Sequence, residues 1–126
     1  MPTIAECGGF QYLGAELDGR KMCGVLSHKS ENKKRLVRFG YVNITSKRDG
    51  LFGKKGTTIS AHEFHYYDST DNGNDFRAVK PNGKEWDIAV TTETLYAGYP
   101  HLYLYSNIKA AEAFYEKCLD YKENKK

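Results

Sequence analysis

A cysteine near the start of the chain, at an abrupt change of sequence pattern, constrains the fold most strongly. Residues 2–6 form a short apolar run without polar alternation, as a buried strand does. Cys7 follows at once, and after it Gly8 and Gly9 allow the backbone to turn tightly. Residues 8–17 then carry apolar side chains at helical spacing. The pattern predicts a strand, a sharp turn and a helix, with the Cys7 thiol at the turn.

The position of Cys7 suits a nucleophile, but it also has a simpler explanation. A helix N-terminus lowers a thiol pKa, and the arrangement resembles a nucleophile elbow with cysteine in place of serine. His101 is the candidate base, because a catalytic partner must be near in space and not in sequence. Most free cysteines, in contrast, are small buried hydrophobes without chemistry. Both interpretations of Cys7 stay open at this point.

The composition is that of one ordinary globular domain in a reducing compartment. Of the 126 residues, 40% are hydrophobic and 28% are charged. The net charge of +3 is too small to indicate nucleic acid as a partner, and no apolar run is long enough to cross a membrane. Three cysteines without close pairing argue against a disulfide framework. We therefore expect a cytoplasmic protein with Cys23 and Cys118 in core positions.

A β-rich centre and a second helix are predicted for the rest of the chain. The glycine-rich, basic segment 47–58 is expected to be an exposed loop, and it lacks the spacing of a phosphate-binding loop. His28 is expected in another exposed loop, Gly40 is expected to mark a bulge, and Ser106 is expected to cap the final helix. Strands are predicted over residues 35–46, 62–67, 76–79, 85–92 and 102–105.

The cluster of His62, Glu63 and His65 raises the question of a metal site. A zincin-type pair needs histidines at i and i+4 on a helix, whereas these two are spaced i, i+3 in a predicted strand. On a strand this spacing points the two imidazoles to opposite faces, so they do not bind one ion together. We predict no metal here, and a half-buried strand whose polar residues face a site or an interface.

Several segments, in order, resemble the glutamine amidotransferase domain of the cobyrinate a,c-diamide synthase family. The resemblance extends over residues 3–119, and its most characteristic part is the family's Gly-His-Glu-Phe-His-Tyr segment, with Ala61 in place of the usual glycine. The segments are Ala5-Glu6-Cys7-Gly8-Gly9 with Tyr12-Leu13, Met22-Cys23-Gly24-Val25-Leu26, Arg38-Phe39-Gly40-Tyr41, His62-Glu63-Phe64-His65-Tyr66 and Tyr99-Pro100-His101-Leu102.

The resemblance implies an α/β fold: a partial class I glutamine amidotransferase-like (flavodoxin-like) domain with a β-rich centre and two flanking helices. It also implies that Cys7 is the nucleophile, His101 its base, and the Gly8 N–H an oxyanion donor. Attack of the thiolate on the side-chain amide of glutamine then releases ammonia, and water hydrolyses the thioester. Further residues are implied to lie in the active region without an assigned role: Glu6, Gly9, His62, Glu63, His65 and Tyr103.

The chain departs from the family's pattern at two positions. Tyr103 stands where the family usually has a second histidine and where other class I amidotransferases have a triad glutamate. Pro100 precedes His101 where the family commonly has leucine. Because the nucleophile strand comes first, residues 1–126 are expected to be the C-terminal part of a longer amidotransferase domain, as a truncated product or as half of a split enzyme.

The implied function is the glutaminase portion of an ATP-dependent a,c-diamide synthase of cobalamin (corrinoid) biosynthesis. Glutamine supplies ammonia for amidation of cobyrinate carboxylates, and ATP and Mg²⁺ are expected on a synthetase domain outside these residues. The expected partner is an upstream synthetase or amidotransferase half, or a second copy of the chain. Two alternatives stay open: a non-catalytic remnant that serves as an interaction subunit, and the same glutaminase half serving another acceptor, such as a different tetrapyrrole.

Overall fold

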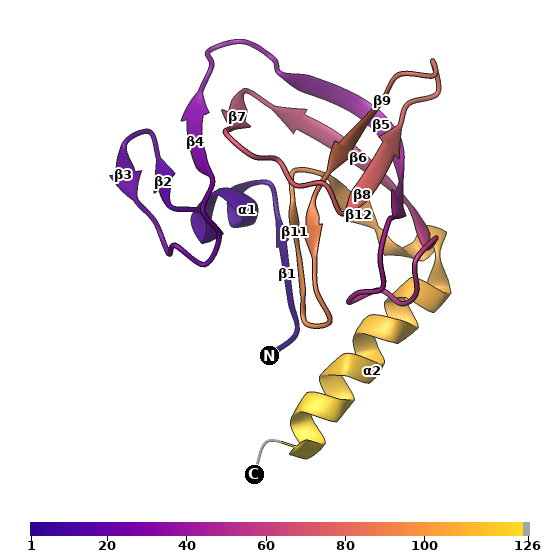
Figure 1. Cartoon of the computed structure of the whole chain (residues 1–126). Helices are drawn as coiled ribbons and strands as arrows, with labels where there is room; N and C mark the ends of the chain where they lie inside the picture. The colour runs from indigo at the N-terminus through magenta and orange to yellow at the C-terminus, as the bar shows by residue number, and fades with distance from the viewer. Residues whose placement is uncertain (125–126) are drawn as a thin grey trace.

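The computed structural model describes residues 1–124 and consists of three small β-sheets, a short helix near the N-terminus and a long helix near the C-terminus (Figure 1). This strand-rich arrangement with helices at its flanks confirms the predicted mixed α/β fold. The elements are β1 (Thr3–Glu6), α1 (Gly8–Leu13), β2 (Glu16–Leu17), β3 (Arg20–Lys21), β4 (Lys29–Asn32), β5 (Arg38–Ser46), β6 (Thr58–His65), β7 (Tyr67–Ser69), β8 (Phe76–Val79), β9 (Glu85–Ile88), β10 (Val90–Thr91), β11 (Leu95–Gly98), β12 (His101–Tyr103), η1 (Leu104–Ser106) and α2 (Ile108–Asn124).

Two of the sheets carry the candidate site. The first has the strand order β1-β11-β10, in which β1 runs parallel to β11 and Glu6 lies opposite Gly98. The second has the order β12-β6-β5-β8-β9 and is antiparallel throughout. A third sheet, β3-β2-β4-β7, lies beside α1. The chain passes from β11 directly into β12, so the first sheet is joined to the second at the point where β1 ends.

The central hairpin β5–β6 forms because its side chains alternate between apolar and polar. Val42 and Ile44 on β5 are buried, and so are Ile59 and Ala61 on β6, while the residues between them face outward. This period of two is that of a strand with one face against the core. Gly40 stays in register opposite Glu63, so the predicted bulge at Gly40 is wrong.

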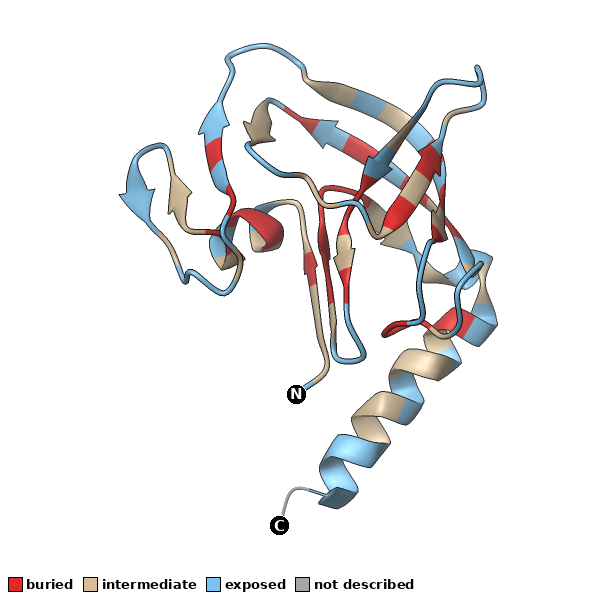
Figure 2. Cartoon of the chain, in the orientation of Figure 1, coloured by how far each residue is buried: buried red, intermediate tan, exposed pale blue. Residues whose placement is uncertain are grey.

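The core lies where the first two sheets meet, and α2 contributes little to it. Figure 2 shows buried residues along the strands and mostly exposed or half-buried residues along α2. Among the described residues of α2, Ala110 is the one that is buried. Large buried side chains of the core include Phe10, Leu51, Phe76, Tyr96 and Tyr99.

The first helix is shorter than predicted, because a tertiary contact replaces its second half. α1 ends at Leu13, and the N–H of Ala15 donates to the carbonyl of His28 at 2.8 Å. His28 is buried, not exposed as expected: its ring stacks on Phe10 with centroids 3.9 Å apart. A side chain at Gly14 would collide with His28, so the close approach of the backbone to His28 just after α1 needs glycine at this position. Packing against His28 therefore overrides the helical spacing of the residues after Leu13, and the helix ends there.

Other predicted boundaries are also corrected. The segment 47–58 is not wholly exposed, because Leu51 and Phe52 insert into the core. The predicted strand over 85–92 is split at Ala89, whose φ of 65° directs β9 and β10 into different sheets. The last helix is capped by Asn107, whose Oδ1 accepts the Ala110 N–H at 3.2 Å, and not by Ser106.

Both remaining cysteines differ from the simple core prediction. Cys23 is exposed, so its predicted core position is wrong, and Cys118 is half-buried on α2.

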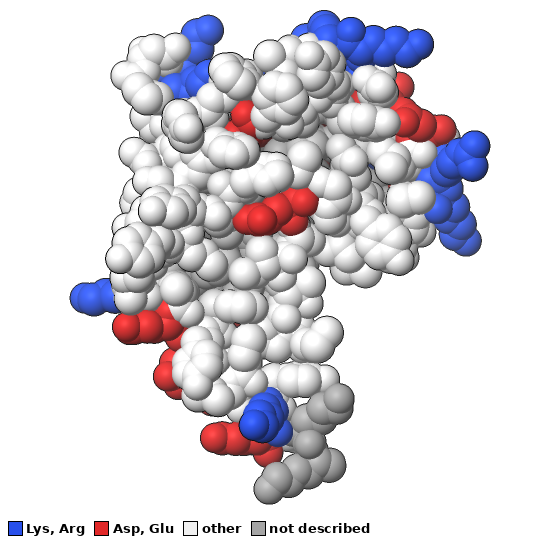
Figure 3. All heavy atoms as spheres, turned by 180° about the vertical axis from the view of Figure 1, so that it is seen from behind, with Lys and Arg blue, Asp and Glu red and all other residues white. Residues whose placement is uncertain are grey.

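Within residues 1–124, no helix is long and apolar enough to cross a membrane. Figure 3, which views the molecule from behind, shows Lys and Arg at the edges of this face and a few carboxylates in its middle.

Candidate active site

The turn between β1 and α1 holds Cys7 in a backbone conformation that residues with side chains rarely adopt. Its φ is 52° and its ψ is −103°, and its N–H donates to the Gly98 carbonyl at 2.8 Å. Gly9 follows closely, where a Cβ atom would lie 3.3 Å from Ala5 Cβ. Positive φ at a cysteine is strained, and such strain is concentrated at functional sites. The strand–turn–helix prediction is confirmed in this segment.

The environment of Cys7 favours the thiol over the thiolate. Burial raises the pKa of Cys7 above its ordinary value, and the nearby carboxylates of Glu63 and Glu6 raise it further. The Gly8 N–H, which lies next to the sulfur, acts in the opposite direction. The expected lowering of the thiol pKa at the helix start is therefore not what the structure indicates, because desolvation and like charge outweigh one backbone donor.

Two hydrogen bonds hold the segment of His101 against the end of β1. The Glu6 carboxylate accepts the Leu102 N–H at 2.7 Å, and the Cys7 N–H donates to Gly98. These contacts lie on either side of His101 in the sequence. Cys7 and His101, which are far apart in the chain, are thus brought to the same end of the first sheet. Among residues 1–124, no hydrogen bond joins the Cys7 thiol to the His101 ring.

His101 lies at the wall of an open hollow on the second sheet. It is opposite His62 in the register of β12 and β6, and the two rings have centroids 5.0 Å apart. The hollow has a volume of about 460 Å³ and a mostly apolar lining. Cys7 is not among the lining residues, which are Phe39, Gly40, Tyr41, His62, Glu63, Phe64 and His101.

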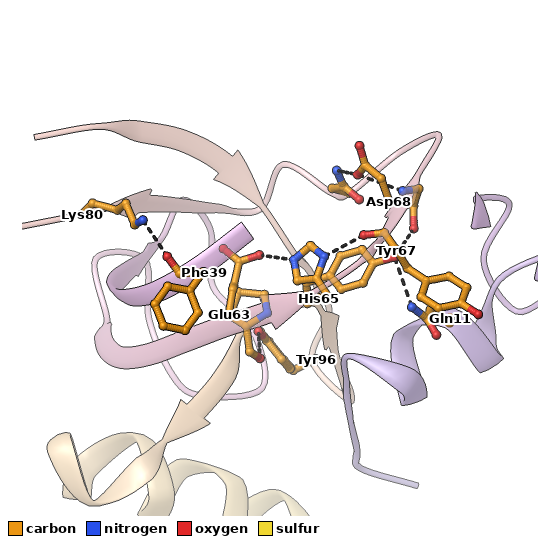
Figure 4. A network of polar contacts seen from close by, with 12 residues as sticks. Gln11, Phe39, Glu63, His65, Tyr67, Asp68, Lys80 and Tyr96 are labelled. Atoms are coloured by element: carbon orange, nitrogen blue, oxygen red, sulfur yellow. Dashed lines mark hydrogen bonds and ion pairs between the residues drawn. The ribbon is translucent and has the colours of Figure 1, made fainter. Parts of the chain in front are cut away.

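The strand β6 separates its polar residues onto two faces, as predicted. His62 is exposed on the outer face, whereas Glu63 and His65 are buried. In Figure 4 the His65 ring bridges the Glu63 carboxylate, at 2.9 Å, and the backbone carbonyl of Tyr67, at 2.7 Å. Among residues 1–124, no group of three or more His, Cys, Asp or Glu side chains is arranged to hold a metal ion.

Among residues 1–124, no hydrogen bond joins the Tyr103 hydroxyl to the His101 ring. The Tyr103 side chain is 60% exposed, and its ring lies near that of Tyr105, with centroids 6.2 Å apart. The sequence could not predict that the Glu6 carboxylate accepts the Leu102 N–H, because a backbone N–H is present in almost every residue. The stacking of Tyr99 on His65, with ring centroids 3.9 Å apart, likewise leaves no signal in the sequence.

Comparisons with known proteins identify the relatives of this chain. Residues 1–108 match the CobB/CobQ-like glutamine amidotransferase domain. The cobyrinate a,c-diamide synthase of Listeria monocytogenes serotype 4b is 36% identical over 116 residues, which cover 85% of this chain and 26% of that protein. The cobyrinate a,c-diamide synthase of Caldanaerobacter subterraneus subsp. tengcongensis is 32% identical over 126 residues, which cover 94% of this chain and 28% of that protein.

The aligned residues therefore cover most of this chain but only a part of each relative. The chain spans between 26% and 28% of the length of these two curated relatives. The family match, in contrast, covers most of the residues described, including Cys7 and His101. The chain belongs to the family of CobB/CobQ-like glutamine amidotransferase domains.

Proposed function

We propose that this chain is the glutaminase portion of an ATP-dependent a,c-diamide synthase that amidates cobyrinate carboxylates. The relatives that it matches are cobyrinate a,c-diamide synthases, and its own domain is of the glutamine amidotransferase type. The observation that carries the proposal is the strained turn at Cys7, held beside the segment of His101 by the Glu6–Leu102 hydrogen bond. A strained turn fixed in this way presents a nucleophile at a defined position.

In the proposed reaction, Cys7 attacks the side-chain amide carbon of glutamine. His101 takes the thiol proton, and the bond between sulfur and carbon forms as the carbonyl oxygen becomes an oxyanion. The Gly8 N–H is the proposed donor to this oxyanion. The C–N bond then breaks, the proton passes from His101 to the leaving amine, and ammonia departs. Water hydrolyses the thioester, which gives glutamate and restores the thiol.

The glycine-rich segment 47–58 does not fit the phosphates of ATP. The glycine-rich segment that most resembles a phosphate loop is closed on itself. The N–H of Gly50 donates to the carbonyl of Gly53 at 2.9 Å, and the N–H of Gly53 donates back at 3.1 Å. These donors are therefore not free to hold phosphates. In this proposal, ATP and Mg²⁺ bind to a synthetase segment outside this chain. The relatives are long enough to contain such a segment, because the matched part covers only 26–28% of their length.

Two observations favour a second function, that of a non-catalytic interaction subunit. The Cys7 pKa is raised by burial, and no hydrogen bond among residues 1–124 links the thiol to His101. A nucleophile needs the thiolate, and a half-buried thiol without a base is inert. In that case the amidotransferase fold would serve to bind a partner chain, and the acceptor would be recognised elsewhere.

Release of ammonia from glutamine distinguishes the two functions. Glutamine labelled with ¹⁵N in its side-chain amide is incubated with the purified chain, and ¹⁵N ammonium is followed by NMR. The glutaminase proposal predicts release that Cys7→Ala abolishes and that Cys23→Ala, at an exposed cysteine, leaves unchanged. If folded wild-type protein releases no ammonium and glutamine gives Cys7 no protection against alkylation, the interaction-subunit function is favoured.

A further inference from the structure

Exposed aromatic side chains gather on the outward side of the second sheet. The strands β5, β6 and β12 direct alternate residues away from the core, and many of these residues are aromatic. Neighbouring rings pack together: the centroids of Phe39 and Phe64 are 5.7 Å apart, and those of His62 and His101 are 5.0 Å apart. We call this surface the aromatic face, and its large exposed side chains are Phe39, Tyr41, Phe64, Tyr66, Tyr103 and Tyr105.

The aromatic face differs from the rest of the same sheet because it carries no charge. The outward residues of β5, β6 and β12 are 39, 41, 43, 45, 58, 60, 62, 64, 101 and 103, and none of them is Asp, Glu, Lys or Arg. On the adjoining strands β8 and β9, in contrast, exposed Arg77 forms ion pairs with Glu85 and Asp87. Aromatic enrichment with depletion of charge is typical of the centre of a protein–protein interface.

The aromatic face is large enough for a stable contact between two proteins. Its large side chains are between 45% and 77% exposed. Since a whole aromatic side chain offers about 150–250 Å², together they leave about 700 Å² of mostly apolar surface in water. That is more than the largest apolar patch of a typical monomer, which is about 300–600 Å². It approaches the roughly 800 Å² that each partner contributes to an interface of standard size.

The shape of the aromatic face is complementary to itself. The hollow of about 460 Å³ lies within it and has His101 at its wall. Tyr103 follows two residues later on β12, and neither Tyr103 nor Tyr105 lines the hollow. Their rings project beside it, 60% and 77% exposed. A two-fold axis brings the same patch of two copies together, so the projecting pair of each copy is able to meet the hollow of the other.

We propose that the aromatic face is the interface of a two-fold symmetric dimer of this chain, in which Tyr103 and Tyr105 of each copy enter the hollow of the other. Burial of the exposed rings drives the association, and no like charges meet because the face is uncharged. A tyrosine hydroxyl, which both donates and accepts, finds hydrogen-bond partners in the imidazoles of His62 and His101. The dimer covers the hollow beside His101, whether or not that residue acts as a base.

The test is the oligomeric state of the purified chain, measured by sedimentation velocity over a range of concentrations. Interfaces of standard size have Kd values that are micromolar or tighter, so wild-type protein at about 100 μM should sediment as a dimer. Its mass should be twice the 14.3 kDa of the chain. Tyr105→Glu places a carboxylate in the hollow of the other copy and should give a monomer under the same conditions, because the charge would be buried without a partner.

Two tyrosines provide a matched pair of variants. Tyr103 and Tyr115 are both 60% exposed, but Tyr103 lies on the aromatic face and Tyr115 lies on α2. Tyr103→Glu should raise the Kd of the dimer by at least about tenfold, since it buries an unpaired carboxylate. Tyr115→Glu should sediment like the wild-type protein. Circular dichroism during heating shows whether each variant is folded.

A wild-type chain that stays monomeric at every concentration overturns the proposal and assigns the aromatic face to a different protein or to a ligand. A dimer that Tyr103→Glu and Tyr115→Glu weaken equally also overturns it, because the contact then lies elsewhere. If a variant on the face fails to fold, nuclear Overhauser effects between isotope-labelled and unlabelled wild-type copies decide. They should join the Tyr105 ring of one copy to the Tyr41 ring of the other, and a dimer without them contradicts the proposal. Release of ammonia from glutamine is measured separately, so failure of the glutaminase function and failure of the dimer are distinguishable.

Discussion

The Glu6 carboxylate accepts a hydrogen bond from the backbone N–H of Leu102 at 2.7 Å, across a separation of 96 residues. The acceptor directly precedes Cys7, and the donor directly follows His101. This contact therefore joins the end of β1, next to the proposed nucleophile, to β12, which carries the proposed base. A charged acceptor makes it stronger than a neutral backbone pair.

Loss of this contact is expected to weaken both the fold and the site. Glu6→Ala leaves the Leu102 N–H without its partner, which should lower the free energy of unfolding by about 1.5–3 kcal/mol. Glu6→Gln retains an acceptor oxygen and should lose less. Urea denaturation measures both, with Glu112→Ala on the exposed face of α2 as control. Equal stability of Glu6→Ala and its control would show that the contact contributes nothing.

The strained backbone at Cys7 makes a prediction that is independent of its chemistry. Its φ of 52° with ψ of −103° suits glycine and disfavours any residue with a Cβ atom. Cys7→Gly should therefore be more stable than Cys7→Ala by about 1 kcal/mol, although both lack the thiol. Chemical denaturation of the two variants side by side gives the difference. A Cys7→Ala variant that equals or exceeds Cys7→Gly in stability would contradict the strain at this turn.

Two glycines near the thiol are expected to differ sharply in their tolerance of a side chain. At Gly98, whose carbonyl accepts the Cys7 N–H, an added Cβ would lie 2.7 Å from Ala89 Cβ. Gly98→Ala should thus destabilise the protein by about 1–3 kcal/mol through overpacking. At Gly8 nothing lies within 4 Å of an added Cβ, so Gly8→Ala should fold with nearly unchanged stability. Thermal unfolding of the pair tests this, and similar melting temperatures would contradict it.

His28 should make the stability of the fold depend on pH. Burial lowers the pKa of His28 below its ordinary value of 6.5, although the hydrogen bond to the Phe10 carbonyl opposes this shift. The unfolded chain then binds a proton that the folded chain resists, so stability is full above about pH 6.5 and decreases as the pH falls toward the folded pKa. In His28→Gln this decrease should be smaller. Urea midpoints across the acidic range measure it, and parallel curves for the two proteins would rule out the effect.

The sequence was most informative where local chemistry and tertiary structure agree. The glycines after Cys7 predicted the turn, and the apolar residues of segment 35–46 predicted the strand that the structure shows as β5. The opposite faces of His62 and His65 followed from the geometry of a strand. The roles of Cys7 and His101, which the turn pattern suggests and the resemblance implies, stay predictions.

Prediction failed where distant residues decide the outcome. α1 ends early because His28 packs against Phe10 and Gly14, and no local pattern contains that contact. Cys23 looked like a core residue by its apolar neighbours, yet it is exposed. The acceptor role of Glu6 depends on a backbone group of Leu102, which any residue at that position except proline would supply.

The reactivity of Cys7 toward an electrophilic glutamine analogue tests the central claim most directly. Intact mass after incubation should show a single adduct on wild-type protein and on Cys23→Ala, and none on Cys7→Ala. His101→Ala should form the adduct far more slowly, because the thiol then lacks its base. A folded wild-type chain that forms no adduct, while small alkylating agents still modify Cys7, would contradict the assignment of a glutamine site in this chain.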